Sequence, residues 1–232
     1  MKKYTKRISN LNSLITEETY SAKEASTLLK ELANAKFDET LEAHISLNID
    51  PKYANQQLRT TLVLPHGTGK DLKIGVFTEP EYVQEALDFG ATKAGSDDFL
   101  EDMSAGNLDF DILITSPQLM PKLAKLGRVL GPKGLMPSPK SGTVTTDLKS
   151  TLNEFKKGKL EYRADKTGIV HLGFGKASFT SDQIAENLSA VFESIEKNKP
   201  SGVKGRYFKS FNVCSTMSPS LAIELASFKK IS

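Results

Sequence analysis

The sequence predicts an α+β domain made of both chain ends, with a split β-α-β pattern and an antiparallel sheet, interrupted by an inserted α/β domain. Three observations lead to this prediction. The length of 232 residues exceeds the usual size of a single domain. Both outer parts combine strand-like alternation of apolar and polar residues with an amphipathic helix. In the middle, short apolar strands alternate with helices, which is typical of a parallel sheet.

The first outer part begins with a helix and continues with two strands. Ser21 and Glu24 have the spacing of a capping box, and apolar residues recur at helical spacing over 21–34. Over 41–49, apolar residues alternate with polar ones, which is the two-residue period of a half-buried strand. A second strand is predicted over 58–64.

The middle of the chain has a different pattern. Residues 73–77 and 110–115 are short apolar strands, and each lies next to a helical segment. The predicted helical segments are 79–89, 97–104 and 117–126. Strands that alternate with helices favour a parallel sheet covered on both faces.

The second outer part returns to an antiparallel pattern. A helix over 147–159 leads to a strand at 160–164, and the turn DKTG at 165–168 connects this strand to another at 169–174. Two strands joined by so short a turn predict a β-hairpin.

A long helix and a last strand complete the pattern. Ser181 is the predicted helix cap, Pro200 ends the helix, and the strand covers 206–215. Turn-rich sequence near Pro65 and a second linker near Lys157 are the predicted crossings between domains, and together they would form a hinge. The predicted domains are residues 1–66 with 158–232, and residues 67–157.

The net charge of +3 hides an uneven distribution of charge along the chain. Residues 79–111 hold one basic residue against ten acidic ones, a net charge of −9. Residues 112–149 hold six basic against one acidic, and residues 150–232 hold thirteen against eight, so each of these stretches carries +5. The separation of acidic and basic residues into different stretches is typical of a protein that contacts a polyanion such as RNA with only some of its faces. Charge alone fits ordinary solvated helix faces equally well.

Cysteine content and hydropathy exclude several classes of protein. Cys214 is the only cysteine, which excludes an internal disulfide and favours a reducing compartment. No apolar run is close to the length of about 20 residues that a membrane-spanning helix needs, so we expect no membrane partner. The amino terminus is basic and lacks the apolar core of a secretory signal, so a cationic arm without a cleaved leader is expected.

Neither nucleotide-binding pattern is complete. The turn PHGTGK at 65–70 lacks the first glycine of a phosphate-binding loop, because Leu64 occupies that position. Gly127, Gly131 and Gly134 do not have the spacing of the dinucleotide-binding fingerprint, and they follow a helix rather than a strand. No cofactor is therefore expected.

No residues are predicted to bind a metal ion or to act as a nucleophile. His44, His66 and His171 lie far apart and lack a neighbouring cluster of carboxylates or cysteines. Cys214 would need a base beside it to become a reactive thiolate, and the sequence places none there. We therefore interpret His44, His171 and Cys214 as strand residues.

The segment 122–145 has an unusual composition, with basic residues among glycines, prolines and apolar residues. Glycine lets a backbone approach a phosphate closely, and proline holds a loop extended. The segment therefore predicts a stiff cationic loop, and the alternative is an irregular solvated loop. Its basic members are Lys122, Lys125, Arg128, Lys133 and Lys140, and its apolar members include Leu130, Leu135 and Met136.

Within this segment, the string LGRVLGPKGLMPSPKSGTVT resembles the signature of the ribosomal protein L-one family, the stalk proteins of the large ribosomal subunit. The resemblance extends to residues 31–52, 58–70, 161–176 and the closing CSTMSPS, in the family's order and at its length. It implies an RNA-binding domain made of both termini, with an inserted Rossmann-like domain and no enzymatic activity.

The resemblance also implies partners and a location. The partners are large-subunit rRNA at the mobile stalk, exit-site tRNA whose release is assisted, other large-subunit proteins and, in bacterial-type members, the protein's own mRNA, whose translation is repressed. A monomer is expected when the protein is free. The location is the ribosome of a bacterial cytoplasm or of a plastid stroma, and the lysine- and asparagine-leaning composition favours the plastid.

Carried over by motif, the resemblance assigns two sets of RNA-facing residues. The implied rRNA contacts are Lys36, Phe37, Thr40, Asp165, Lys166, Ser210, Thr216 and Met217. The implied tRNA-facing basic loop contains Arg128, Lys133 and Lys140. The chain departs from the family's TMG at Ser218, where serine adds a Cβ at a point of close approach to RNA.

Alternatives remain for single residues and for the whole chain. Phe37 could be a core anchor, and Asp165 could serve only the turn. For the whole chain, the alternatives are a free-standing RNA-binding regulator and a nucleotide-dependent enzyme.

Overall fold

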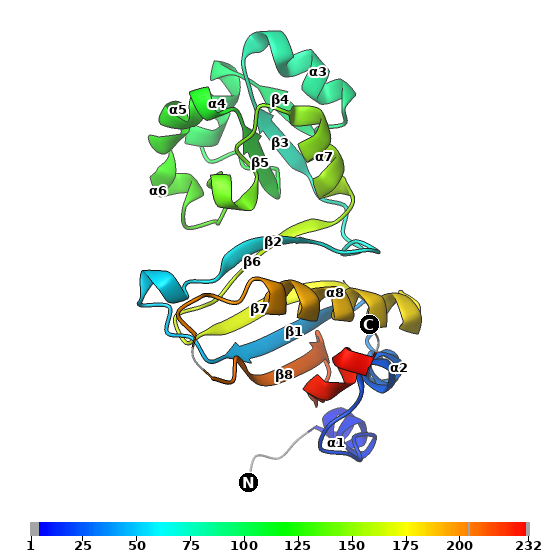
Figure 1. The fold of residues 1–232 in the computed structure, drawn as a ribbon. Helices are drawn as coiled ribbons and strands as arrows, with labels where there is room; N and C mark the ends of the chain where they lie inside the picture. Colours follow the sequence, from blue (N-terminus) through cyan, green and yellow to red (C-terminus); the bar gives the residue numbers. More distant parts are fainter. Residues whose placement is uncertain (1–4, 204, 231–232) are drawn as a thin grey trace. The chain divides into compact units, whose positions relative to one another are not determined.

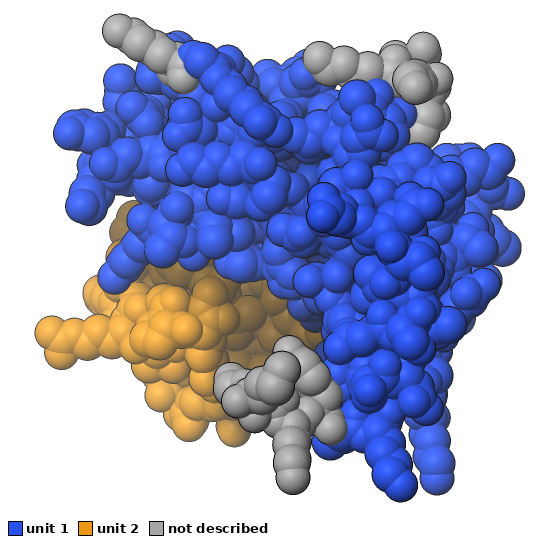
Figure 2. Space-filling view, turned by 90° about the horizontal axis from the view of Figure 1, so that it is seen from below, with its two compact units in different colours: residues 1–69, 161–232 blue, residues 70–160 orange. Residues whose placement is uncertain are grey.

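The computed structural model describes residues 5–203 and 205–230 and divides into two compact units (Figures 1 and 2). Unit 1 comprises Met1–Gly69 and Glu161–Ser232, and unit 2 comprises Lys70–Leu160. The chain crosses between them a few residues after the predicted crossings. Antiparallel and parallel sheets are both present, which confirms a mixed α and β fold.

A four-stranded antiparallel sheet forms the centre of unit 1 (Figure 1). Its strands, in spatial order, are β7 (Ile169–Lys176), β1 (Thr40–Leu47), β8 (Phe208–Ser215) and β9 (Leu221–Ala222). Strand β1, from the first part of the chain, pairs with β7 on one side and β8 on the other. The first and last parts of the chain therefore have to fold together to complete this sheet.

The two faces of this sheet differ in polarity. Along β1, Leu41, Ala43, Ile45 and Leu47 are fully buried, and helices α2 (Ala22–Leu32) and α8 (Ser181–Lys197) pack on the unit's sheet. The alternate side chains lie on the opposite face and are only partly buried or exposed. We call this face the polar face; it carries Glu42, His44 and Ser46 of β1 and Ser210, Asn212 and Cys214 of β8.

One predicted helix cap is confirmed and one is wrong. The capping box of Ser21 and Glu24 is present at α2. At α8 the predicted cap Ser181 is wrong, because Thr180 is the cap: its hydroxyl accepts from the Gln183 backbone N–H, and its own backbone N–H donates to the Gln183 side-chain oxygen. The expected amino-terminal arm contains a helix, α1 (Lys6–Ser13), capped by Thr5; residues 1–4 of that arm lie outside the described residues.

Strands β2 (Arg59–Val63) and β6 (Lys159–Arg163) form a separate two-stranded sheet. The predicted hairpin is present only as its turn, because β6 and β7 lie in different sheets and a single bridge of Ala164 with Val170 joins them. Gly168 in its turn has a φ of 80°, and a Cβ there would lie 2.9 Å from the Ile49 carbonyl oxygen. The turn therefore requires glycine, both for its left-handed backbone and for its close contact with the chain beyond β1.

Unit 2 has a parallel sheet, as the sequence predicts, but with three strands instead of the two predicted. Its strands, in spatial order, are β4 (Lys93–Gly95), β3 (Ile74–Phe77) and β5 (Ile112–Thr115). Its helices are α3 (Val83–Asp88), α4 (Asp97–Ser104), α5 (Met120–Ala124), α6 (Gly127–Leu130) and α7 (Leu148–Lys156). Ile74 and Val76 belong to a core cluster with Leu152 of α7, whereas Phe77 belongs to another with Met103 of α4. Helices therefore cover both faces of the sheet.

Short 3-10 helices make up the remaining elements. They are η1 (Ala54–Gln56), η2 (Pro80–Tyr82), η3 (Pro117–Leu119), η4 (Pro139–Ser141) and η5 (Leu225–Lys230). Among the described residues, no helix combines the length and the apolar character needed to cross a lipid bilayer.

Candidate nucleic-acid interface

The predicted rRNA contacts all lie in unit 1, in two groups near opposite ends of β1. The first group is Lys36, Phe37, Thr40, Thr216 and Met217. The second group is Asp165, Lys166 and Ser210, because Ser46 near the other end of β1 pairs with both Ile169 and Ser210. The six-residue step from Thr40 to Ser46 corresponds to about 20 Å of extended strand. The polar face lies between the two groups.

A buried carboxylate holds the first group together. Glu39 is completely buried and accepts three hydrogen bonds. Its Oε1 accepts from the backbone N–H of Ala35 at 2.9 Å, and its Oε2 accepts from the Ser215 hydroxyl at 2.7 Å and the Met217 backbone N–H at 2.9 Å. One side chain therefore connects the loop that carries Lys36 with the loop that carries Met217.

The surroundings of Glu39 stabilise its charged form. Burial opposes ionisation and is the largest single influence on this group. The hydrogen bonds from Ser215, Ala35 and Met217, together with the positive charge of Arg7, outweigh burial and hold the pKa of Glu39 below its usual value. We infer that Glu39 positions the two loops as an ionised acceptor.

Thr40 and Thr216 make a second connection between the same loops. The Thr216 hydroxyl accepts from the Thr40 backbone N–H at 3.1 Å and lies 3.3 Å from the Thr40 carbonyl oxygen, to which it donates. The Thr216 backbone N–H also donates to that oxygen, at 3.1 Å. Lys176 donates to the Thr40 hydroxyl at 2.8 Å. Both threonine hydroxyls therefore already have partners within the protein.

The first helix of the chain also contacts this group. Arg7 of α1 donates two hydrogen bonds to the Asn34 side-chain oxygen, at 2.9 and 2.7 Å, and a third to the Met217 carbonyl oxygen at 3.0 Å. Sequence reasoning missed Arg7, Glu39 and Lys176 as members of this site. Residue type and position along the chain do not reveal the contacts of Arg7 with Met217, Glu39 with Ser215 and Lys176 with Thr40, because these partners lie far apart in sequence.

Two large apolar side chains of the first group face solvent. Phe37 is 55% exposed and Met217 is 50% exposed, and Lys36 beside them is exposed as well. The alternative that Phe37 is a core anchor is therefore wrong. A flat ring, a polarisable thioether and a cation on two fixed loops form a surface on which a nucleotide base or ribose can pack.

Asp165 has a clear structural task in the second group. Its Oδ1 accepts from the backbone N–H groups of Thr167 and Ile169, both at 2.8 Å, and from the Thr167 hydroxyl at 2.7 Å. These bonds, led by that of Ile169, hold the pKa of Asp165 below its usual value. The turn role expected as an alternative is thus present, and the RNA contact stays a prediction. Lys166 in the same turn is exposed.

Ser218, where the resemblance implies glycine, does not have a left-handed backbone, since all described positive-φ residues are glycines. Its hydroxyl accepts from the Ser215 backbone N–H at 2.9 Å. The serine therefore fits the loop without strain and fixes the end of β8.

The basic segment of unit 2 is ordered by its own contacts. Leu130 is fully buried, and Leu135 and Met136 pack against the core cluster around Phe77. The buried hydroxyl of Thr143 accepts from the Ser138 backbone N–H at 2.9 Å. The segment is therefore ordered, but it is not the single stiff loop that the sequence predicts, because Lys122 lies on α5 and Gly127–Leu130 form α6, whereas residues 131–138 contain no helix or strand. The predicted tRNA-facing residues Arg128, Lys133 and Lys140 are all exposed on this segment.

Comparison with known proteins assigns the chain to a family. Residues 29–219 match the Ribosomal protein L1p/L10e family. The chain belongs to this family. As a member of the L1p/L10e family it is a ribosomal protein rather than an enzyme.

Relatives in the L1p/L10e family align with almost the entire chain. Large ribosomal subunit protein uL1 of Prochlorococcus marinus strain MIT 9515 is 59% identical over 225 residues, covering 97% of this chain and 96% of the relative. Large ribosomal subunit protein uL1c of Rhodomonas salina is 58% identical over 229 residues, covering 99% and 98%. The uL1c of Guillardia theta gives the same figures of 58%, 99% and 98%. Cyanobacterial and plastid-type relatives are therefore similar to the chain to the same degree.

A hollow of about 470 Å³ in unit 2 bears on the nucleotide-enzyme alternative. It lies beyond the carboxyl ends of β3 and β5, where α/β proteins often bind ligands. Its charged lining residues are Glu79, Glu85 and Asp147 against Lys149. Three carboxylates to one cation repel the phosphates of a nucleotide, so the hollow does not support that alternative.

Two predictions about reactive side chains are wrong, those for Cys214 and for the histidines. The sequence places no base beside Cys214, yet the Cys214 Sγ lies 3.4 Å from His44 Nε2. The histidines were expected to lie far apart without carboxylate or cysteine neighbours, yet the Nδ1 atoms of His44 and His171 lie 2.8 Å apart and Glu42 is close to His44. Strand register brings these residues together, and single-sequence patterns do not encode register. Burial and the nearby charge of Glu42 raise the pKa of the Cys214 thiol.

Proposed function

We propose that this protein is a constituent of the large ribosomal subunit that binds large-subunit rRNA at the mobile stalk through unit 1. The rRNA surface consists of the loop at 36–40, the loop at 215–218, the polar face and the turn at 165–168. In this proposal, residues 1–66 with 158–232 form the rRNA-binding domain, and residues 67–157 form an inserted Rossmann-like domain.

The connection through Glu39 is the observation that carries this proposal. A buried, ionised carboxylate bonds three donors on two loops, and these loops present Phe37 and Met217 to solvent. Exposing two large apolar side chains on loops that the protein holds rigidly has no benefit for folding. Such a surface suits a structured RNA, which proteins read largely through its shape, sugars and unstacked bases.

The direct test measures binding of an rRNA fragment that contains the stalk junction. Phe37→Ala and Met217→Ala should each weaken binding by about 5- to 150-fold, the range for about 1 to 3 kcal/mol of lost stacking or packing. Val63→Ala is the matched control, because Val63 is similarly exposed, at 47%, but lies on β2. Equal affinity of the two loop variants and the wild type would remove this surface from the interface.

Lysine variants test the phosphate contacts separately. If Lys36 and Lys166 each neutralise one phosphate, replacement of either by alanine lowers the salt dependence of binding by about one ion. Lys23→Ala, on the exposed side of α2, is the control and should leave the salt dependence unchanged. An unchanged slope in the Lys36 or Lys166 variant would exclude that residue as a phosphate ligand.

We further propose that unit 2 presents Arg128, Lys133 and Lys140 to exit-site tRNA and assists its release. The ordered backbone and exposed cations of this segment support the proposal, and the acidic block at 79–111 would keep the rest of the unit away from RNA. Repression of the protein's own mRNA would use the rRNA surface of unit 1, since one surface can bind an mRNA that mimics the junction.

The relatives support a location on ribosomes of a plastid or of a bacterial cytoplasm. Co-sedimentation with large subunits separates this proposal from a free-standing RNA-binding regulator. A ribosomal constituent sediments with the subunit at stoichiometric amounts and stays bound at moderate salt, whereas a free regulator remains in the supernatant.

A further inference from the structure

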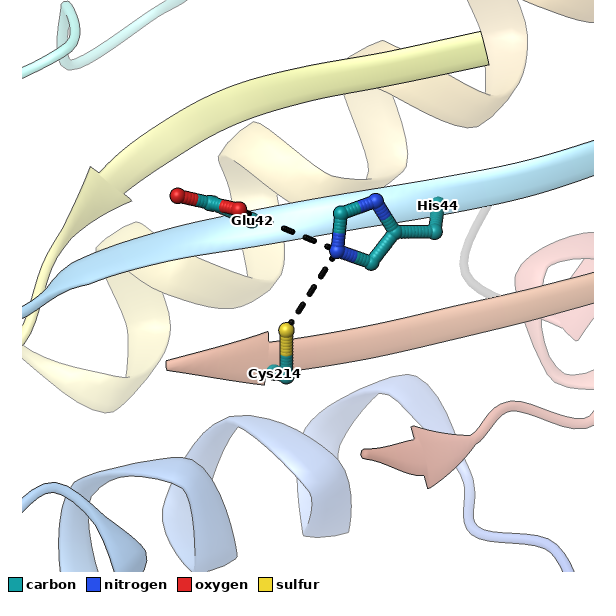
Figure 3. Close-up of side chains that lie close together, drawn as sticks. All are labelled: Glu42, His44 and Cys214. Atoms are coloured by element: carbon teal, nitrogen blue, oxygen red, sulfur yellow. Dashed lines mark hydrogen bonds and ion pairs between the residues drawn. The ribbon is translucent and has the colours of Figure 1, made fainter. Parts of the chain in front are cut away.

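A cluster of potential metal ligands lies on the polar face of unit 1 (Figure 3). Glu42 and His44 project from β1, and Cys214 projects from the adjacent strand β8. Their ligand atoms all lie within 4.8 Å of one another. In Figure 3 both dashed lines end at the same ring nitrogen of His44, with the carboxylate on one side and the sulfur on the other.

The distances within the cluster are close to those around one ion. His44 Nε2 lies 3.4 Å from Cys214 Sγ and 3.8 Å from Glu42 Oε2. A tetrahedral zinc ion with ordinary bond lengths places neighbouring sulfur, nitrogen and oxygen ligands about 3.3 to 3.6 Å apart. The third pair, Cys214 Sγ and a Glu42 carboxylate oxygen, lies within 4.8 Å, so side-chain rotations that shorten this distance bring the three atoms to one ion. Glu42 and His44 are partly exposed, at 42% and 33% of their side chains, so an ion can enter from solvent.

The other ring nitrogen of His44 is already oriented. His44 Nδ1 lies 2.8 Å from His171 Nδ1, and His171 Nε2 lies 3.8 Å from Asp165 Oδ2. When His44 Nδ1 carries the proton and donates it to His171, the Nε2 lone pair of His44 faces Cys214 and Glu42. Metal-binding histidines usually donate their second N–H in this way, which fixes the tautomer and the ring orientation.

The charges of the three groups also match a divalent cation. A Cys214 thiolate and a Glu42 carboxylate together neutralise two positive charges. Thiolate, imidazole and carboxylate are the ligand types of Zn²⁺, and a thiolate disfavours Mg²⁺ and Ca²⁺, which prefer oxygen ligands.

We propose that Glu42, His44 and Cys214 form a zinc-binding site on the polar face, with His171 and Asp165 as positioning residues. Binding displaces the Cys214 thiol proton, which passes to solvent, and forms one bond from each side chain to the ion. Three protein ligands leave the fourth tetrahedral position for a water molecule or for an oxygen of a molecule that docks on the polar face. The site concerns the protein alone and does not depend on the proposed RNA binding.

Cobalt titration of the full-length, chelator-treated protein tests this site, because Co²⁺ takes the place of Zn²⁺ and reports thiolate ligation by a charge-transfer absorption. We expect this absorption to saturate at one Co²⁺ per chain and to disappear when Zn²⁺ is added. Cys214→Ser should abolish it. His171→Gln should weaken Co²⁺ affinity by about 10- to 100-fold, the usual effect of losing a positioning partner, and His44→Gln by at least as much.

His66→Gln is the matched control, since His66 also lies beside a carboxylate, with its Nε2 2.6 Å from Glu186, in a pair that no cysteine joins. This variant should bind Co²⁺ like the wild type. Circular dichroism establishes that each variant is folded, and Zn²⁺ should raise the melting temperature of the wild type but not of Cys214→Ser. Absence of the charge-transfer absorption in the wild type, or its full retention in His44→Gln, would overturn the proposal.

Discussion

The role of Glu39 as a buried, ionised acceptor predicts a large effect of a small change, Glu39→Gln. The amide has nearly the shape of the carboxylate but replaces one oxygen by an NH₂ group. Oε1 of Glu39 accepts from Ala35, and Oε2 accepts from Ser215 and Met217. Whichever way the amide turns, its NH₂ group faces a backbone N–H, and two donors then meet in a buried position.

The expected loss of stability follows from the number of buried donors that Glu39→Gln leaves without an acceptor. If the amide oxygen keeps Ala35, the NH₂ group can donate to the Ser215 hydroxyl, but the Met217 N–H loses its acceptor. One buried, unpaired donor costs about 1 to 3 kcal/mol. Urea unfolding near neutral pH should therefore give a free energy of unfolding lower by that amount. The fixed positions of Phe37 and Met217 should be lost as well, so rRNA affinity should also fall.

The pKa of Glu39 adds a pH dependence with a definite sign. Because the pKa is lower in the folded state than the ordinary value of 4.5, ionised Glu39 stabilises the fold above that value. This stabilisation is lost as the pH falls through the folded pKa. The difference between the wild type and Glu39→Gln should therefore be largest near neutral pH and shrink as the solution is acidified below 4.5.

Glu31→Gln is the control, since Glu31 is an exposed carboxylate of α2. Its free energy of unfolding should match that of the wild type at every pH. If Glu39→Gln is as stable as Glu31→Gln near neutral pH, or if its deficit persists unchanged in acid, Glu39 is not the ionised acceptor inferred from its contacts.

Three further predictions concern single side chains. Thr216→Val removes a hydroxyl that both accepts from and donates to the Thr40 backbone, so urea unfolding should show a loss of about 0.5 to 1.5 kcal/mol, which Thr216→Ser should restore. Asp165→Ala should lower the melting temperature, because the turn loses the carboxylate that accepts its backbone hydrogen bonds. This difference from the wild type should vanish in acid, because below the lowered pKa of Asp165 the wild-type carboxylate is protonated and loses the same bonds. Replacing Lys133 and Lys140 together by glutamine should leave rRNA affinity in a binding titration nearly unchanged but slow tRNA release from ribosomes; an equal loss of rRNA affinity would refute the division of tasks between the units.

Local signals in the sequence account for most of the predicted elements. The capping box at Ser21 and the alternation over 41–49 depend on neighbouring residues only, and the structure contains the helix and the strand they predict. The cap of α8 was also encoded locally, since Thr180 has a glutamine three residues later whereas Ser181 has Ile184. Strand β4 has only three residues, too few to give a periodic pattern.

The candidate site could be predicted only in part, because its connections are made across the chain. Residues 36–40, with the sequence KFDET, contain two carboxylates, and no local pattern distinguishes them. In the structure Asp38 is exposed and bonds Ser178, whereas Glu39 is buried and bonds Ser215. The exposed residues of this segment could be identified by resemblance. The residue that positions them depends on the pairing of β1 with β8, which only the folded chain reveals.

The pairing of β1 with β8 also determines how much the folding of unit 2 contributes to the stability of unit 1. Thr40 and Thr216 bond across 176 residues, and Lys70–Leu160 between them forms a separate unit. Loop-closure entropy grows only with the logarithm of loop length, so halving the flexible chain by folding unit 2 lowers the cost of joining the two loops by about 0.6 kcal/mol. One unpaired donor beneath Glu39 costs more than that. The stability of the candidate interface therefore depends more on a few buried hydrogen bonds within unit 1 than on the folding of unit 2.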